Sequence, residues 1–289
     1  MRLTHLYLPY QFDYQIHLIP GAKQYFSDLE FLICNTCIND NVLIGLTEIF
    51  KSVKECELYI TDVNNYNIVK LIETIKELFS ILLLSEVIGG LMNHFTEFLK
   101  IHYFNDVTKC ECLKNLSLPF LQILKVRRAP IEVLASLIKN ANGCLTKIKV
   151  DDICDETNNQ ILIQVIYQNC QNLKDLRLSC RNDDILELEN LLVKCRYLIK
   201  LHIIDNEMLN WDYLFEVLIK SSPTCLFNFG FWFFEAPRLE SLDLFFDKWK
   251  NKHIMLLKTI QIHICYPPVY VLNDEYFNLI EKYKLQGCY

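Results

Sequence analysis

Six-residue segments with the same spacing of apolar residues recur in the middle of this chain. The clearest copies are LQILKV at 121–126, LTKIKV at 145–150, LKDLRL at 173–178 and LIKLHI at 198–203. Each copy has apolar residues at its first, fourth and sixth positions, and successive copies begin 24, 28 and 25 residues apart. Because alternate residues of an extended strand share a face, positions four and six would point to one side. The pattern therefore predicts short β-strands repeated at a nearly constant period.

Segments with helical periodicity separate these copies. Apolar residues recur in them at steps of three and four, as Ile161, Val165 and Ile166 do, which gives each segment one apolar face. The predicted helices cover 41–52, 67–78, 131–140, 159–169, 184–195 and 212–220, and the candidate N-caps are Asp155, Asn158, Asp183 and Asn210. A strand followed by a helix in every repeat closes as a right-handed parallel coil, in which neighbouring repeats must stack to bury their apolar faces.

Weaker copies of the motif extend the pattern toward both ends. They begin at Leu3, Leu29, Val53, Phe79, Leu226, Leu239 and Leu257. The spacing is irregular at 80–120, where a weak strand at 98–103 and the doubled motif LKNLSL then LQILKV leave the register open. At 226–262 the steps fall to 13 and 18 residues, which predicts loops or single turns in place of helices. A helix at 273–285 would cap the C-terminal end.

These elements predict an α/β fold, with the architecture of a solenoid. A curved parallel sheet would form its concave face, and the helices would form its convex face. No linker rich in Gly, Ser or Pro divides the chain, so 1–289 is expected to be a single domain. Repeat folds of this kind present a long surface, which favours binding over catalysis.

Composition narrows the class of protein. The chain has 289 residues, of which 52% are hydrophobic and 22% are charged, as in a globular protein. A net charge of -6 gives no overall attraction to nucleic acid or to an anionic membrane, so neither is expected as a partner. The longest apolar stretch, 78–92, is shorter than the roughly 20 residues that span a bilayer. The N-terminus does not resemble a secretory signal, so the thirteen cysteines are expected as free thiols in the cytoplasm or nucleus.

The segments NCQNLKDLRLSC and KCRYLIKLHI, within 144–203, resemble the cysteine-containing leucine-rich repeats of the ribonuclease-inhibitor-like class. A second similarity is LEFLICNTCINDNVLIGL, which begins at Leu29, although Asn39 stands where that family usually has threonine. Such repeats most often form the substrate-reading part of F-box proteins, and the abundance of Ile, Asn and Cys is similar to fungal F-box-like proteins. The resemblance implies substrate recognition for a ubiquitin ligase. An F-box itself is not seen, because the first motif copy begins at Leu3, so binding of a ligase adaptor rests on analogy alone.

Cysteine pairs offer the main alternative, a zinc-binding or cysteine-dependent module. Cys34 and Cys37 are three residues apart, and Cys110 and Cys112 form a second close pair. A structural zinc site needs four ligands, and neither pair has a histidine at the usual distance. The seven histidines are scattered and no nucleophile or phosphate-loop motif occurs, so we expect no enzymatic activity, no cofactor and no metal. A structural fragment of a longer protein is a third interpretation.

Outward-pointing residues of the predicted strands are where function is expected, because they do not serve the core. Basic residues recur at these positions: Lys125, Arg127, Lys147, Lys149, Arg177, Lys200 and His202. Stacked in register, they would form a basic stripe that binds an acidic or phosphorylated segment of a partner protein. The alternative is a solvated face that Asp151, Asp152 and Asp175 partly neutralise.

A group of nine aromatic residues lies between Phe227 and Trp249. Trp232, Phe245 and Trp249 are candidate contacts for a partner, because aromatic side chains anchor many protein interfaces. Two short strands cannot point nine aromatic side chains inward, which favours exposure of some of them. The alternative is that they fill the core of the two shortened repeats.

Overall fold

The computed structural model describes most of the chain, and its residues group into two compact units. The described residues are 3–9, 12–35, 38–50, 52–60, 66–75, 78, 80–85, 113–127, 129–151, 159–205, 209–233, 236–252, 261–264 and 274–286. The first unit comprises Met1–Leu121 and Lys125–Ala141, and the second comprises Gln122–Leu124 and Asn142–Tyr289. In both units parallel strands alternate with helices, so the α/β class predicted from the sequence is confirmed.

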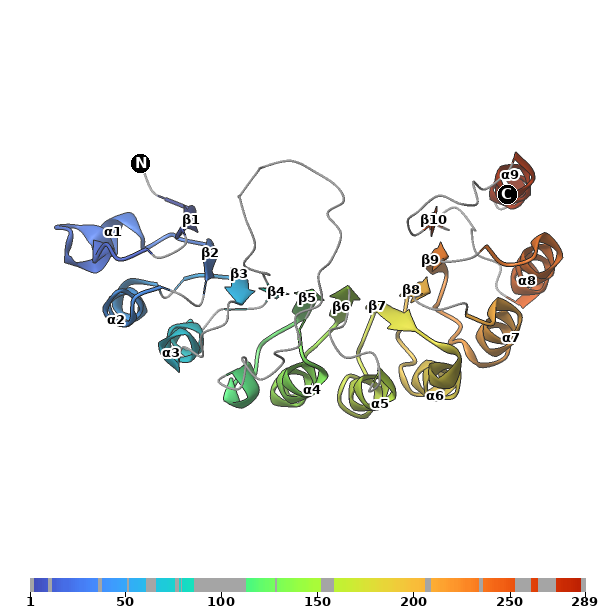
Figure 1. Ribbon diagram of the computed structural model, residues 1–289, viewed down its shortest axis with the longest axis horizontal. Helices are drawn as coiled ribbons and strands as arrows, with labels where there is room; N and C mark the ends of the chain where they lie inside the picture. Colours follow the sequence, from blue (N-terminus) through green and yellow to red (C-terminus); the bar gives the residue numbers. More distant parts are fainter. Residues whose placement is uncertain are drawn as a thin grey trace. The chain divides into compact units, whose positions relative to one another are not determined.

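Strands β1 to β4 of the first unit pair in parallel and in chain order. The elements of this unit are β1 (His5–Tyr7), η1 (Ile16–Leu18), α1 (Ala22–Tyr25), β2 (Phe31–Asn35), α2 (Asp40–Ile49), β3 (Glu55–Ile60), α3 (Tyr66–Thr74), β4 (Ser80–Ser85) and α4 (Ile131–Asn140). Helices α2 and α3 lie on the same side of strands β2 and β3 (Figure 1). One face of these strands is therefore covered by helices.

The second unit repeats this arrangement, with β6 to β10 paired in parallel and in chain order. Its elements are β6 (Lys147–Asp151), α5 (Asn159–Asn169), β7 (Asp175–Cys180), η4 (Asn182–Asp184), α6 (Ile185–Lys194), β8 (Lys200–Asp205), α7 (Trp211–Ser221), β9 (Asn228–Phe233), α8 (Leu239–Lys252), β10 (Gln261–Ile264) and α9 (Asp274–Gln286). Helices α5 to α8 lie on one side of strands β6 to β9 (Figure 1). Strand β5 (Ile123–Arg127) contains residues of both units.

The four clearest sequence motifs form strands β5 to β8, as predicted. Their first, fourth and sixth residues are all at most 2% exposed: Leu121, Leu124, Val126, Leu145, Ile148, Val150, Leu173, Leu176, Leu178, Leu198, Leu201 and Ile203. The residues between them are less buried, and β6 shows a strict alternation of buried and half-buried positions. Each strand thus points one set of side chains into the core and the other set away from it.

Strand starts share one hydrogen-bonding pattern. Two successive backbone N–H groups at the start of a strand donate to a single carbonyl of the preceding repeat. In β7, for example, Lys174 and Asp175 both donate to the Thr146 oxygen, at 2.8 and 3.1 Å. The other shared acceptors are the carbonyls of Thr4, Glu30, Gln122, Lys174 and Ile199. The recurrence ties each repeat to its neighbour at the same point and fixes the register of the strands.

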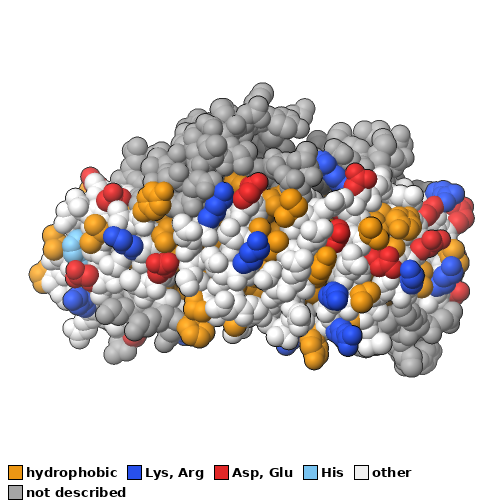
Figure 2. Space-filling model, turned by 90° about the horizontal axis from the view of Figure 1, so that it is seen from below, with side chains coloured by type: hydrophobic (Ala, Val, Ile, Leu, Met, Phe, Trp, Pro, Cys, Tyr) orange, Lys and Arg blue, Asp and Glu red, His pale blue; other side chains and the backbone are white. Residues whose placement is uncertain are grey.

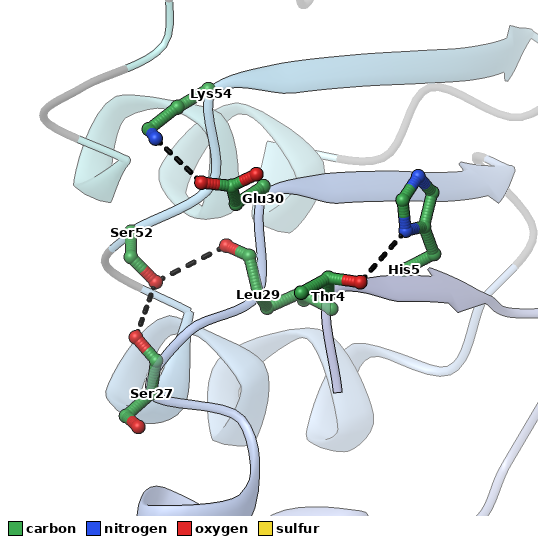
Figure 3. A network of polar contacts seen from close by, with 7 residues as sticks. All are labelled: Thr4, His5, Ser27, Leu29, Glu30, Ser52 and Lys54. Atoms are coloured by element: carbon green, nitrogen blue, oxygen red, sulfur yellow. Dashed lines mark hydrogen bonds and ion pairs between the residues drawn. The ribbon is translucent and has the colours of Figure 1, made fainter. Parts of the chain in front are cut away.

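Polar side chains before the strands add further contacts between neighbouring repeats. In the first unit the Ser52 hydroxyl donates to the carbonyls of Ser27 and Leu29, at 2.7 and 3.1 Å, and Lys54 pairs with Glu30 (Figure 3). The Ser52 hydroxyl thus pairs with two backbone carbonyls that an apolar side chain at this position would leave without a donor.

In the second unit, cysteines lie three residues before the first leucine of two motifs. Cys170 and Cys195 are fully buried, and the Cys195 thiol lies 3.6 Å from the Cys170 carbonyl oxygen. Burial raises the pKa of both thiols to about 12, so they stay protonated and act as small apolar side chains. Both side chains are therefore part of the core at the turns before β7 and β8.

Helix starts follow the predicted caps in part. The Asn210 side chain accepts a hydrogen bond from the Tyr213 N–H at 3.1 Å and caps α7, as predicted. Before α6 it is Asp184, rather than the predicted Asp183, whose carboxylate accepts from a backbone N–H, that of Arg181. Asp155 and Asn158 lie outside the described residues.

The prediction of loops or single turns within 226–262 was wrong. LESLDL, which begins at Leu239, opens the 14-residue helix α8. The segment follows a helical period, since Leu242, Phe245, Phe246 and Trp249 are buried on one face of α8, whereas Leu244, the sixth residue of the motif, is 53% exposed. A six-residue motif cannot distinguish these alternatives when its leucines are three residues apart.

The irregular region 80–120 is described only in part. Of the doubled motif, LQILKV contains a strand, whereas residues 113–115 of LKNLSL form a short 3-10 turn. The weak strand expected at 98–103 lies outside the described residues. The expected terminal helix is present as α9, where Lys282 pairs with Asp243 of α8 at 3.1 Å.

The face drawn in Figure 2 carries charges of both signs. Basic and acidic side chains lie next to one another there, between separate hydrophobic side chains (Figure 2). In the second unit, Lys220 pairs with Glu189 at 3.0 Å, and Arg238 pairs with Asp212. Within the described part of the chain, no helix is long and apolar enough to cross a membrane.

Candidate functional site

The outward-pointing side chains of β6 to β9 form the candidate site, which we call the second-unit strand face. Its members are Lys147, Lys149, Asp151, Asp175, Arg177, Ser179, Lys200, His202, Asn228, Gly230 and Trp232. The register aligns Lys149, Arg177, His202 and Gly230 in one row across the four strands. Of the basic residues that the sequence predicted to form one stripe, the structure thus places Lys147, Lys149, Arg177, Lys200 and His202 together on this face.

Two of these cations are already neutralised by neighbours on the same face. Lys147 pairs with Asp175 of the adjacent strand at 2.8 Å, and Arg177 Nε lies 2.5 Å from Asp151 Oδ1. Lys149 and Lys200 have no ion-pair partner among the described residues. The alternative of partial neutralisation thus applies to part of the face, and a net positive charge remains around Lys149.

Lys149 lies in an environment that disfavours its charge. Partial burial is the main cause that lowers the pKa of its ammonium group, and the positive charges of Lys147 and Arg177 lower it further. The carboxylates of Asp175 and Asp151 act in the opposite direction. An anion placed beside Lys149 would therefore relieve a repulsion that the unliganded face contains.

The Trp232 side chain lies over the second-unit strand face and contacts two members of the row described above. The Arg177 guanidinium sits 4.4 Å from the centroid of the indole ring, and the His202 ring lies 5.4 Å from it. Gly230 makes this arrangement possible. A Cβ atom there would stand 2.2 Å from His202 Nδ1 and 2.6 Å from the indole ring, so any larger residue would displace one of the two rings.

His202 does not contribute a positive charge near neutral pH. Burial is the main cause that lowers the pKa of its imidazole to about 4, and Lys149, Arg177 and Lys200 lower it further, while Asp175 opposes them. The sequence grouped His202 with the basic residues, but here it is a neutral ring beneath Trp232. Its Nδ1 atom is buried without a hydrogen-bond partner.

Buried polar atoms without a hydrogen-bond partner gather on this face. Among the described residues they include Asp151 Oδ1, Asp175 Oδ1, Arg177 Nε, Ser179 Oγ and His202 Nδ1. The Arg177 and Asp151 atoms are close enough for an ion pair but lack the direction of a hydrogen bond. Since buried polar groups are normally paired, this concentration sets the second-unit strand face apart from the apolar core beneath it.

Other predicted site residues lie elsewhere. Lys125 is half-buried and Arg127 is exposed on β5, and both belong to the first unit rather than to the second-unit strand face. Phe245 and Trp249 are each 1% exposed, so they do not form a surface. They were expected to come from a strand, whereas α8 points them into the core, where both pack against Phe229. Of the three aromatic candidates, only Trp232 is partly exposed.

Cysteine chemistry has little support among the described residues. Cys34 is buried beside Cys56, and a hydrogen bond with that thiol raises the pKa of Cys34 well above its usual value. Cys37, Cys110 and Cys112 lie outside the described residues. The described part of the chain contains no group of His, Cys, Asp or Glu residues that could hold a metal ion.

Sequence reasoning missed Gly230 and the role of Asp151 as the partner of Arg177. A glycine within the aromatic run NFGFWF was an available signal, because glycine inside a strand often marks close approach of another group. Comparison with known proteins adds no relative: no protein-family model matches this chain, and no curated protein matches it.

Proposed function

We propose that this chain is a leucine-rich-repeat solenoid that binds a partner protein and performs no chemistry of its own. The repeating strand, the repeating helix and the shared acceptor carbonyls at strand starts support the solenoid. Repeats of this kind stack so that each contacts its neighbours, which produces a long row of outward-pointing strand residues. Within this row, the second-unit strand face combines a lysine that has no ion-pair partner among the described residues with a partly exposed tryptophan.

The observation that carries the proposal is the half-buried Lys149 beside an ordered Arg177–Trp232 contact. Lys149 keeps an unneutralised charge while its neighbours Lys147 and Arg177 are paired. A rigid aromatic side chain next to a cation is a combination that protein interfaces favour. The partner would supply an acidic or phosphorylated segment, as the sequence predicts.

Charge reversal at Lys149 tests this function. Lys149→Glu, compared with Lys194→Glu on the exposed helix side, should weaken capture of a specific partner from a cell extract without lowering the melting temperature. Lys149 is preferred to Arg177, because replacing Arg177 also breaks its ion pair with Asp151. Equal capture by wild type and Lys149→Glu would contradict a role for this face.

The resemblance to F-box proteins adds a narrower role, that of a substrate receptor in a ubiquitin ligase. Mass spectrometry of the captured proteins should then detect cullin-adaptor subunits together with one specific client. A client without adaptor subunits would support protein binding and contradict the ligase role.

A further inference from the structure

We propose that the second-unit strand face binds an extended segment carrying an unphosphorylated aspartate or glutamate at Lys149 and an apolar side chain at Trp232. This inference rests on the proposed protein-binding function and deepens it. It assigns one chemical class of partner to the face and gives the two anchor residues different roles. The occupant would cross the strands, from β6 toward β9.

A carboxylate fits the available charge better than a phosphate. Phosphate sites usually present several arginine or lysine side chains that are free to pair with the phosphate oxygens. Here the only arginine on the face is paired with Asp151 and stacked on Trp232, and Lys147 is paired with Asp175. Lys200 is not in the row of Lys149, because the register puts it opposite Asp175. A phosphate dianion would therefore meet one unneutralised lysine in the row together with the repulsion of two carboxylates, whereas a single carboxylate balances Lys149.

Trp232 supplies the second anchor, because its position is fixed before binding. The ring is held between Arg177 and His202, and Gly230 leaves the space in which it lies. Little side-chain entropy is then lost when a partner packs on the ring. Since His202 is neutral near neutral pH, this end of the row favours an apolar side chain over a second acidic one.

The spacing between the anchors follows from sheet geometry. The indole ring lies over β7 and β8 rather than over its own strand, since it contacts Arg177 and His202. Neighbouring strands lie about 4.8 Å apart, so the ring is about 5–10 Å from β6 across the sheet. An extended segment advances about 3.4 Å per residue, which places its two anchor residues about two positions apart. Residues two apart in an extended chain point to the same side, so both can face the sheet.

Selection from a displayed library of random linear peptides tests the inference on the full chain. Wild type should enrich peptides with Asp or Glu about two positions from a large apolar residue. Lys149→Glu should lose these peptides, Trp232→Ala should lose the apolar preference, and Lys194→Glu should behave as wild type. Equal melting temperatures of all variants would show that folding is retained.

Matched synthetic peptides then separate the two anionic groups. Replacing the selected Glu by Gln should weaken binding about tenfold, as for loss of one charged contact. Replacing it by phosphoserine should give no gain in affinity. A clear gain with phosphoserine, which Lys149→Glu abolishes, would overturn the carboxylate assignment and point to a phosphorylated partner.

Failure of the inference can be distinguished from failure of the proposed function. Enriched peptides without acidic residues, whose binding survives Lys149→Glu but not Trp232→Ala, would overturn the inference and leave a protein-binding face. If no peptide is enriched and Lys149→Glu captures the same proteins as wild type, both are overturned.

Discussion

Buried aspartates between a strand and the following helix show how individual side chains stabilise a repeat. Asp205 is 1% exposed, and its two carboxylate oxygens accept from the Leu209 N–H at 3.1 Å and from the Trp211 indole N–H at 3.2 Å. Asp184 is 3% exposed and accepts from the Asn159 side chain at 2.7 Å. Both carboxylates replace water as acceptors for groups that the turns leave unpaired. Their burial, however, opposes their charge.

Asp184 allows these two effects to be separated. Asp184→Ala leaves the Arg181 N–H without its acceptor and should destabilise the protein by about 1–3 kcal/mol. Asp184→Asn keeps an acceptor oxygen without a charge, so it should cost much less near neutral pH. Urea unfolding of the three proteins measures the difference.

The pH dependence of the same variants gives a second readout. Burial raises the pKa of Asp184 above its unfolded value of about 3.9. The carboxyl group therefore contributes most to stability below that value, and the contribution is lost as pH rises through the folded pKa. Relative to wild type, Asp184→Asn should gain stability between about pH 4 and neutral pH; a constant difference would contradict an effect of burial.

Strands of this chain were predicted more reliably than the elements between them. Positions one, four and six of the motif specify both the strand and its buried face, so β5 to β8 followed directly from the pattern. The helices 131–140 and 159–169 were also predicted with the observed bounds. At Leu239 the prediction failed, because two leucines three residues apart fit a strand motif and a helix face equally well.

The candidate site was predictable in position but not in charge. Alternation identified Lys149 and Arg177 as outward residues, because the side-chain period of a strand is fixed. Arg177 is paired with Asp151 and stacked on Trp232. These contacts join strands that are far apart in the sequence, so the motif in one strand does not predict them. The neutral state of His202 likewise depends on burial under a ring from the next strand.

Helix α7 provides a test at the level of one element. Its N-cap, Asn210, accepts from the Tyr213 N–H, so Asn210→Ala should destabilise the protein by about 1 kcal/mol. Asn210→Asp is the matched control, because it keeps the acceptor and places a negative charge at the positive end of the helix dipole. Thermal unfolding should give Asn210→Ala a lower melting temperature than both wild type and Asn210→Asp. An equal loss in both variants would contradict the role of the side-chain oxygen as the cap of α7.

Across the molecule, each described unit is held together by contacts between successive repeats. Shared acceptor carbonyls occur in both units, and the buried strand residues pack on those of the neighbouring strand. If the chain is the proposed linear array of repeats, its stability is a sum of terms within repeats and terms between neighbours. A local loss of packing should then spread first to adjacent repeats, whereas a domain with one shared core would respond everywhere at once.

Buried thiols can distinguish these two behaviours. Leu201 is fully buried in β8, so Leu201→Ala should cost about 2–5 kcal/mol. Cys180 lies on the preceding strand and Cys195 just before β8, and both are fully buried; Cys34 is 1% exposed in the first unit. If the chain is a linear repeat array, alkylation followed by peptide mass spectrometry should show faster labelling of Cys180 and Cys195 in the variant, with Cys34 little changed.

The exposed Cys144 provides the internal standard for this experiment, because its labelling should not depend on unfolding. Leu186→Ala, at a position 61% exposed on α6, is the matched substitution that removes the same side chain without opening the core. Equal acceleration at Cys34, Cys180 and Cys195 would contradict the solenoid, since it would mean that loss of one leucine opens both units together. A graded response would instead show that each repeat depends mainly on its neighbours. In such an array the outward strand residues can change without loss of the fold, because the contacts between repeats are made by the buried residues.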